Sequence, residues 1–177
     1  MSMMVQTSTD DAPELLARIE HRRANGLDRY DEWWEGVYRI VTGPSRDHQR
    51  LLMAMANLIQ TRLTGDVLEV LPGINIGLDK DDMRVPDLAV LPIDTPLTSP
   101  GFQSTADLVV EILSPGERAG EKLPFYARWG VSEYLEVDLN LRTARWLQYT
   151  DGEWMPIDRS SIIDLSVAEV VAMLPPA

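Results

Sequence analysis

The sequence feature that most constrains the fold is a single glutamate inside an apolar run. Residues 108–113 read Leu-Val-Val-Glu-Ile-Leu, and such a nearly continuous apolar run is typical of a β-strand that is buried on both faces. An unpaired carboxylate in that position would cost several kcal/mol, so Glu111 requires a cation or a proton. The chain must therefore fold around a buried acidic group and its partner.

A second acidic residue follows a proline in another apolar segment. Residues 84–91 predict a strand that Pro86 begins and that carries Asp87 near its start. If adjacent strands bring the carboxylates of Asp87 and Glu111 to about 4 Å, their repulsion is roughly 4 kcal/mol at an effective dielectric near 20. A divalent cation would remove this penalty, and a basic side chain would remove part of it.

The same residues also fit a purely structural role. Glu111 could form an ion pair with Arg84 or Lys122 and serve only to hold the fold together. Buried ion-pair networks share the burial and the charge of active sites. The local pattern therefore leaves a metal site and a structural ion pair as two open alternatives.

The predicted elements combine helices with short strands, which indicates an α/β fold. Apolar residues at three- and four-residue spacing predict helices, and short apolar runs bounded by Gly, Pro or Asp predict strands. The predicted helices are 11–24, 45–65, 121–129 and 167–173; the strands are 35–41, 67–71, 74–78, 84–91, 108–113, 133–138 and 143–149; a turn is expected at 72–73, a hairpin end at 79–82 and a loop at 92–105.

Length and composition bound the organisation of the chain. The 177 residues fit one domain, so we expect a single domain at 11–177 after a flexible tail at 1–10. The absence of cysteine excludes disulfides and thiolate-bound zinc, and leaves oxygen or imidazole ligands for any metal. The sequence has neither a signal-peptide pattern nor an apolar segment of the roughly 20 residues that a membrane helix needs. A cytoplasmic protein without membrane association is the expectation.

The net charge of −12 argues against a protein that simply coats nucleic acid. Such proteins usually carry positive charge, because neutralising the phosphates supplies most of their affinity. A local basic patch or bound metal ions could still offset the acidity of this chain.

Several short motifs occur in an order that resembles a known family. They are Glu35-Gly36, Pro44-Ser45 with His48, Val85-Pro86-Asp87, the segment 109–115, Glu121-Lys122 with Tyr126, and the segment 130–134. Together they cover roughly residues 33–150 and resemble the Uma2 family (DUF820 type), which is classed with restriction-type endonucleases in the PD-(D/E)XK nuclease superfamily. Each motif alone is weak, whereas their order and spacing together are fairly specific.

The resemblance implies a restriction-endonuclease-like core, with a mixed central β-sheet flanked by helices, and hydrolysis of phosphodiester bonds in DNA. Asp87 and Glu111, with a backbone carbonyl near Ile112, would bind Mg²⁺ or Mn²⁺ through oxygen ligands. The usual lysine position of the second motif is Leu113 here, and the resemblance implies that Lys122 has taken over its role from the following helix. A restriction-like role also implies a homodimer, since cutting two strands needs two active sites.

The resemblance assigns further candidates around this site. His48 would contact phosphate or a metal-bound water, and Glu35 would supply a third metal ligand. Arg118 stands where family members commonly carry an Asp, and Glu117 is an imperfect substitute for it. This departure and the acidity favour an alternative function, in which the same fold is a non-catalytic dimeric interaction module and its acidic residues are structural.

Overall fold

The protein has an α/β fold with two mixed β-sheets, which a computed structural model describes for residues 12–41, 43–78, 82–114 and 117–175. The predicted α/β class, with a mixed sheet flanked by helices, is confirmed. The expected tail at 1–10 and most of the acidic turn, residues 79–81, lie outside the described residues. The helices are α1 (Ala12–Ala24), α2 (Arg46–Arg62), α3 (Leu123–Arg128) and α4 (Val167–Ala172).

The strands are short in one sheet and longer in the other. The small sheet has the order β2-β1-β5-β4-β8-β7, and the large sheet has the order β12-β11-β10-β9-β6-β3. The strands are β1 (Glu32–Trp34), β2 (Val37–Arg39), β3 (Leu68–Pro72), β4 (Asn75–Gly77), β5 (Met83–Arg84), β6 (Leu88–Pro92), β7 (Leu97–Ser99), β8 (Phe102–Gln103), β9 (Leu108–Leu113), β10 (Glu133–Asp138), β11 (Thr143–Thr150) and β12 (Glu153–Ile157).

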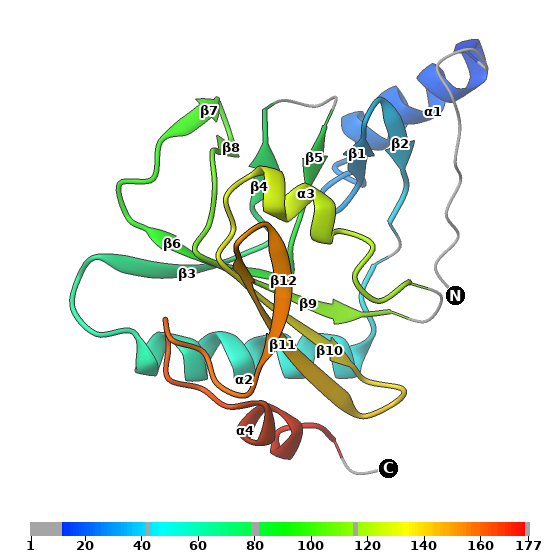
Figure 1. Ribbon diagram of the computed structural model, residues 1–177. Helices are drawn as coiled ribbons and strands as arrows, with labels where there is room; N and C mark the ends of the chain where they lie inside the picture. Colours follow the sequence, from blue (N-terminus) through cyan, green and yellow to red (C-terminus); the bar gives the residue numbers. More distant parts are fainter. Residues whose placement is uncertain (1–11, 42, 79–81, 115–116, 176–177) are drawn as a thin grey trace.

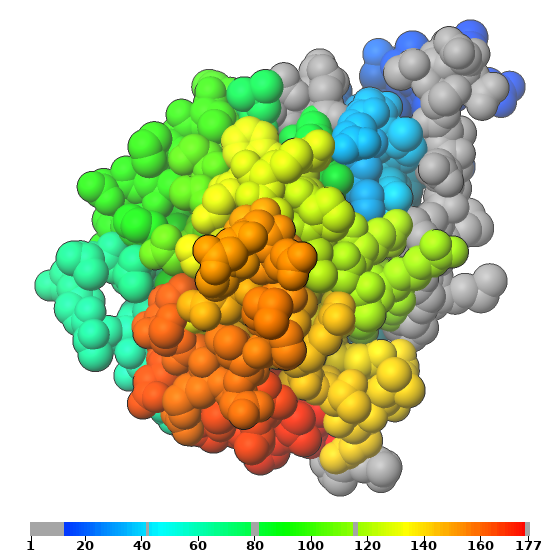
Figure 2. Space-filling view, in the orientation of Figure 1, coloured from blue at the N-terminus to red at the C-terminus, as the bar shows by residue number. Residues whose placement is uncertain are grey.

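Helices cover both faces of the large sheet. β9 and β10 run parallel and the other neighbours run antiparallel, so α3 forms the crossover between the two parallel strands. α2 and α4 lie on one face of the sheet, and α3 lies on the other face together with the small sheet (Figure 1). On the side shown in Figure 2, the orange β11–β12 segment lies over the middle of the molecule and the blue α1 projects at its edge.

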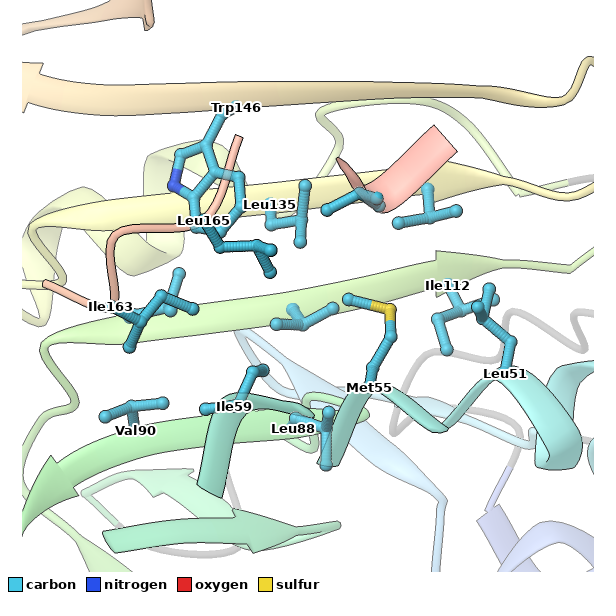
Figure 3. Packing of buried hydrophobic residues seen from close by; sticks show 14 of the residues in the cluster. Leu51, Met55, Ile59, Leu88, Val90, Ile112, Leu135, Trp146, Ile163 and Leu165 are labelled. Carbon is cyan, nitrogen blue, oxygen red and sulfur yellow. The ribbon is translucent and has the colours of Figure 1, made fainter. Parts of the chain in front are cut away.

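The main core lies between α2 and the large sheet. Leu51, Met55 and Ile59 of α2 are buried against alternate residues of the sheet, among them Leu88 and Ile112 (Figure 3). Side chains of a strand alternate between its faces, so Glu111 lies on the opposite face from Ile112. Glu111 therefore points toward α3 and the small sheet.

The segment that carries His48 begins as predicted. Ser45 caps α2, and its side chain accepts a hydrogen bond from the His48 backbone N–H at 3.2 Å. The apolar spacing seen in the sequence is the buried face of this helix. The cap and the packing together fix the first turn of α2, and so the position of His48.

Several predicted elements are wrong in ways that have a physical reason. The strand predicted at 35–41 is a hairpin of β1 and β2, whose turn places Glu35 and Gly36 at φ values of 51° and 84°. The turn predicted at Pro72-Gly73 does not join two paired strands: β3 pairs with β6, and β4 pairs with β5 and β8. The segment predicted as one strand at 84–91 is divided at Pro86 into β5 and β6.

The remaining corrections add strands where none was predicted. The predicted loop at 92–105 contains β7 and β8, and β12 lies at Glu153–Ile157, for which no element was predicted. These short strands contain few of the β-branched residues on which a prediction would depend. β9, which carries Glu111, and its parallel neighbour β10 have the predicted bounds.

Candidate functional site

Asp87 lies at the start of β6, where three parts of the chain meet. Its Oδ2 accepts a hydrogen bond from the backbone N–H of Ile112 at 2.7 Å, which fixes the carboxylate beside β9. Its Oδ1 lies 3.2 Å from Nε2 of His48, whose side chain is buried at the first turn of α2. Burial opposes the protonation of His48, but the Asp87 carboxylate outweighs it and raises the pKa of His48.

Glu111 is the buried acid of the same site. Both of its oxygens accept hydrogen bonds from Nζ of Lys122 at 3.0 Å, and Oε1 also accepts one from the Tyr126 hydroxyl. Burial raises the pKa of Glu111 to about 8, in opposition to the attraction of Lys122. The carboxylate is therefore held in a position where its negative charge is only partly compensated.

Lys122 lies directly before α3, at the N-cap position, and its side chain reaches back to the sheet. Burial opposes its charge, but the carboxylates of Glu111 and Glu32 outweigh this effect and raise the pKa of Lys122. The predicted start of this helix at 121 is two residues too early. Because Lys122 precedes the helix rather than lying within it, its ammonium can point toward β9.

Glu32 is the residue of the site that the sequence did not reveal. It lies on β1, its side chain is 5% exposed, and Oε1 accepts a hydrogen bond from Lys122 Nζ at 2.8 Å. The sequence offered Glu32 and Glu35 three residues apart, and only the hairpin turn decides which of them points inward. An acid next to two tryptophans at the start of a hairpin is the signal that could have identified Glu32.

The structure does not bring Glu35 into this cluster. Its side chain is 71% exposed in the β1–β2 turn and lies 3.0 Å from Arg128. The other four candidates, His48, Asp87, Glu111 and Lys122, line one cavity together. A second cavity adjoins this one, and it is lined by Glu117 and Arg118, the two residues expected from the sequence near the site. The two cavities share four charged lining residues: Glu32, Glu111, Glu117 and Lys122.

The donor set fits a hard divalent cation. Asp87 and Glu111 contribute carboxylate oxygens to one cavity. The positively charged ammonium of Lys122 forms an ion pair with Glu111, so Glu111 already binds one cation. Among the described residues, no three Asp, Glu or His side chains are grouped so that they could hold a metal ion. A cation between Asp87 and Glu111 would take its other ligands from backbone carbonyls and water, as Mg²⁺ commonly does.

Comparisons with known proteins agree with the motif order and the fold. The family model Uma2, described as "Putative restriction endonuclease", matches residues 13–170. The chain belongs to the Uma2 family. The matched range of this Uma2 chain contains every residue of the site described above. A comparison with curated proteins gave no match.

Solved structures share the fold of this Uma2 chain. One is described as "a putative nuclease belonging to DUF820 from Anabaena variabilis ATCC 29413" and has a TM-score of 0.66. The match covers 82% of this chain and 91% of that chain at 18% sequence identity, a level at which the likeness shows the fold alone. Within the described part of the Uma2 chain, every helix is too short or too polar to span a membrane.

Proposed function

We propose that this Uma2 protein is a metal-dependent endonuclease that hydrolyses phosphodiester bonds in DNA. The observation that carries the proposal is the convergence of Asp87, Glu111 and Lys122 in one cavity, with both carboxylates held by hydrogen bonds. Membership of a family described as restriction endonucleases supports the same reaction. Mg²⁺ or Mn²⁺ would be held by Asp87 and Glu111, with a backbone carbonyl near Ile112.

The bound cation would lower the pKa of a water molecule and offset charge on the phosphate. Asp87 contributes a carboxylate oriented by the Ile112 N–H, and His48 sets the position of its other oxygen. Glu111 contributes an oxygen that is oriented by a hydrogen bond from the Tyr126 hydroxyl. Lys122 contributes an ammonium beside these carboxylates, where it stabilises negative charge that develops on the phosphate.

A second candidate function has one observation in its favour. Lys122 is neutralised by two carboxylates, Glu111 and Glu32, as in a structural ion-pair network. On this reading the protein is a non-catalytic interaction module on the same fold. The homodimer and the cytoplasmic location expected from the sequence remain predictions under both functions.

The test of the proposed function is DNA cleavage by the full chain with Mg²⁺ or Mn²⁺. We expect Asp87→Asn and Glu111→Gln to lower the cleavage rate at least about a hundredfold, because each removes a charged metal ligand. We expect Lys122→Met to lower it by about 10²–10³, the usual loss when a group that stabilises the transition state is removed. Cleavage is measured on double-stranded and single-stranded substrates.

The matched control is Asp158→Asn, which makes the same chemical change at an exposed position remote from the cavity. This variant should cut as fast as the parent. An Asp87→Asn protein that also cuts as fast as the parent would contradict the metal assignment. A parent that cuts no DNA with either cation would favour the non-catalytic module.

A further inference from the structure

Glu32 connects the parts of the site that come from different regions of the chain. Its Oε1 accepts hydrogen bonds from Lys122 Nζ at 2.8 Å and from the backbone N–H of Val85 at 2.9 Å. Its Oε2 accepts one from Nε1 of Trp34 at 2.7 Å. A buried carboxylate with three donors is held in one position, so Glu32 fixes what it contacts.

The two contacts on Oε1 join the small sheet to both halves of the site. Val85 lies two residues before Asp87, so its bond to Glu32 sets the position of the segment that enters β6. Lys122 is the residue that contacts Glu111. Because Glu32 Oε1 binds both groups, it fixes the distance between the Lys122 ammonium and the backbone segment from Val85 to Asp87.

Lys122 has acceptors on two carboxylates, and they are not equivalent. The oxygens of Glu111, each 3.0 Å from Nζ, are the ones that a divalent cation would require. Glu32 Oε1 lies closer, at 2.8 Å, and its other oxygen is engaged by Trp34. An ammonium displaced from Glu111 keeps its hydrogen bond to Glu32, whereas Glu117 acts on it through its charge. A buried charge without a hydrogen-bonded partner is strongly unfavourable.

We propose that Glu32 is a positioning residue that retains Lys122 in the site when a divalent cation takes the Glu111 oxygens. The inference rests on the proposed function and deepens it. Glu32 acts through Lys122 and is not a ligand of the cation. Without it, the ammonium remains on Glu111 and competes with the cation.

The experiment is a calorimetric titration of the metal-free full chain with Mn²⁺. Glu32→Gln keeps the size and part of the hydrogen bonding of the side chain but removes its charge. We expect it to weaken Mn²⁺ binding about 10–100-fold, the usual effect of losing a partner behind a metal ligand. In a Lys122→Met background, Glu32→Gln should change the affinity by no more than about twofold, the range in which independent sites add.

Glu133→Gln is a closely matched control. Glu133 is fully buried on β10 and also accepts hydrogen bonds from a tryptophan, Trp146 Nε1 at 2.9 Å, and from a backbone N–H, that of Ser161 at 2.8 Å. Its replacement should lower the melting temperature as Glu32→Gln does, since both remove a buried hydrogen-bond acceptor. The Glu133→Gln protein should bind Mn²⁺ with the same affinity as the parent.

Three results of the Mn²⁺ titration would overturn the inference. Glu32→Gln that binds Mn²⁺ as tightly as the parent overturns this inference and leaves the proposed function intact. A loss of affinity that persists in the Lys122→Met background overturns it, because Glu32 would then act without Lys122, either as a direct metal ligand or through the Val85 segment that leads to Asp87. A parent that binds no Mn²⁺ overturns the proposed function and this inference together.

Discussion

Glu111 is positioned at a cost in stability. It shares the register of Glu136 on the neighbouring parallel strand, so two carboxylates lie side by side on the same face of the sheet. Arg145 pairs with Glu136 at 2.7 Å, and Lys122 pairs with Glu111. Even with these partners the pKa of Glu111 is raised, chiefly by burial, which means that ionising it opposes folding.

The stability of the metal-free protein should therefore fall as the pH rises through the titration of Glu111. The pKa of this carboxyl is about 8 in the folded protein against 4.5 without the fold, so the folded state binds more protons between these values. The contribution is most favourable below about pH 4.5 and decreases up to about pH 8. Thermal unfolding in a chelator, followed from pH 5 to pH 9, measures it.

Glu111→Gln is the variant that isolates this effect. A neutral side chain of the same size removes the titration, so its advantage in melting temperature over the parent should increase with pH and be smallest at pH 5. The same replacement should lower the cleavage rate at least about a hundredfold, as expected where a functional site is maintained at the expense of stability. A difference in melting temperature that does not change with pH would contradict the raised pKa.

Among the individual residues of the site, the sequence revealed those whose side-chain type conflicts with that of their neighbours along the chain. Glu111 was identifiable because a charged residue stood within an apolar strand, and Asp87 because it followed Pro86 at the start of another. Glu32 was not identifiable, since residues 32–35 offer two acids and only the backbone of the hairpin turn distinguishes them. Side-chain direction in a turn depends on φ and ψ, which local composition does not determine.

The residues directly before α3 determine where Lys122 lies. The backbone N–H of Gly120 donates to Oε2 of Glu136 at 2.6 Å, and Glu136 is itself held by Arg145. Gly120 has a φ of 70°, and a Cβ at that position would lie 2.7 Å from Nη2 of Arg145. Glycine is required here for its conformation, and a Cβ would also force the flexible end of Arg145 to shift.

We therefore expect Gly120→Ala to impair stability and activity together. The left-handed backbone costs about 1–2 kcal/mol for any other residue. The added methyl group also pushes Arg145 away from Glu136, which shifts the segment that aims Lys122. Chemical denaturation and DNA cleavage measure the two effects.

Gly152→Ala is the control for backbone strain alone. Gly152 has a φ of 88° in the β11–β12 turn, and a Cβ there would meet nothing within 4 Å. This variant should lose about the same 1–2 kcal/mol and keep its full activity. If the two alanine variants were equally active, the contact of Gly120 with Arg145 would have no bearing on Lys122.

The elements that sequence reasoning recovered are those whose own residues determine them. β9 and β10 are buried runs, and α2 has a cap and a full apolar face, so local pattern was sufficient. β7 and β8 have three and two residues in a segment rich in proline; β8 forms along the edge of β4, and β7 pairs with β8. Pairing of this kind is set by the tertiary structure, and no local pattern reveals it.

The whole molecule holds its site between two sheets that share one core. Ile76 of β4 in the small sheet is fully buried with Ala89 and Val109 of the large sheet and with Phe125 of α3. The site is built the same way, because Glu32 comes from the small sheet and Glu111 from the large one. Neither sheet can separate without exposing this core and breaking the hydrogen bonds to Glu32.

The described residues should therefore unfold in one cooperative transition. This is the behaviour of a single domain, which is the organisation expected from the sequence. In urea, tryptophan fluorescence, which includes Trp33 and Trp34 of the small sheet, should lose its native signal at the same midpoint as far-UV circular dichroism. Ile76→Ala should lower the free energy of unfolding by about 2–5 kcal/mol, the usual cost of truncating a buried isoleucine. Because Ile76 of the small sheet packs against residues of the large sheet, both midpoints should move to lower urea by the same amount. A fluorescence transition that precedes the dichroism transition, in the parent or in the variant, would mean that the small sheet is a separate unit.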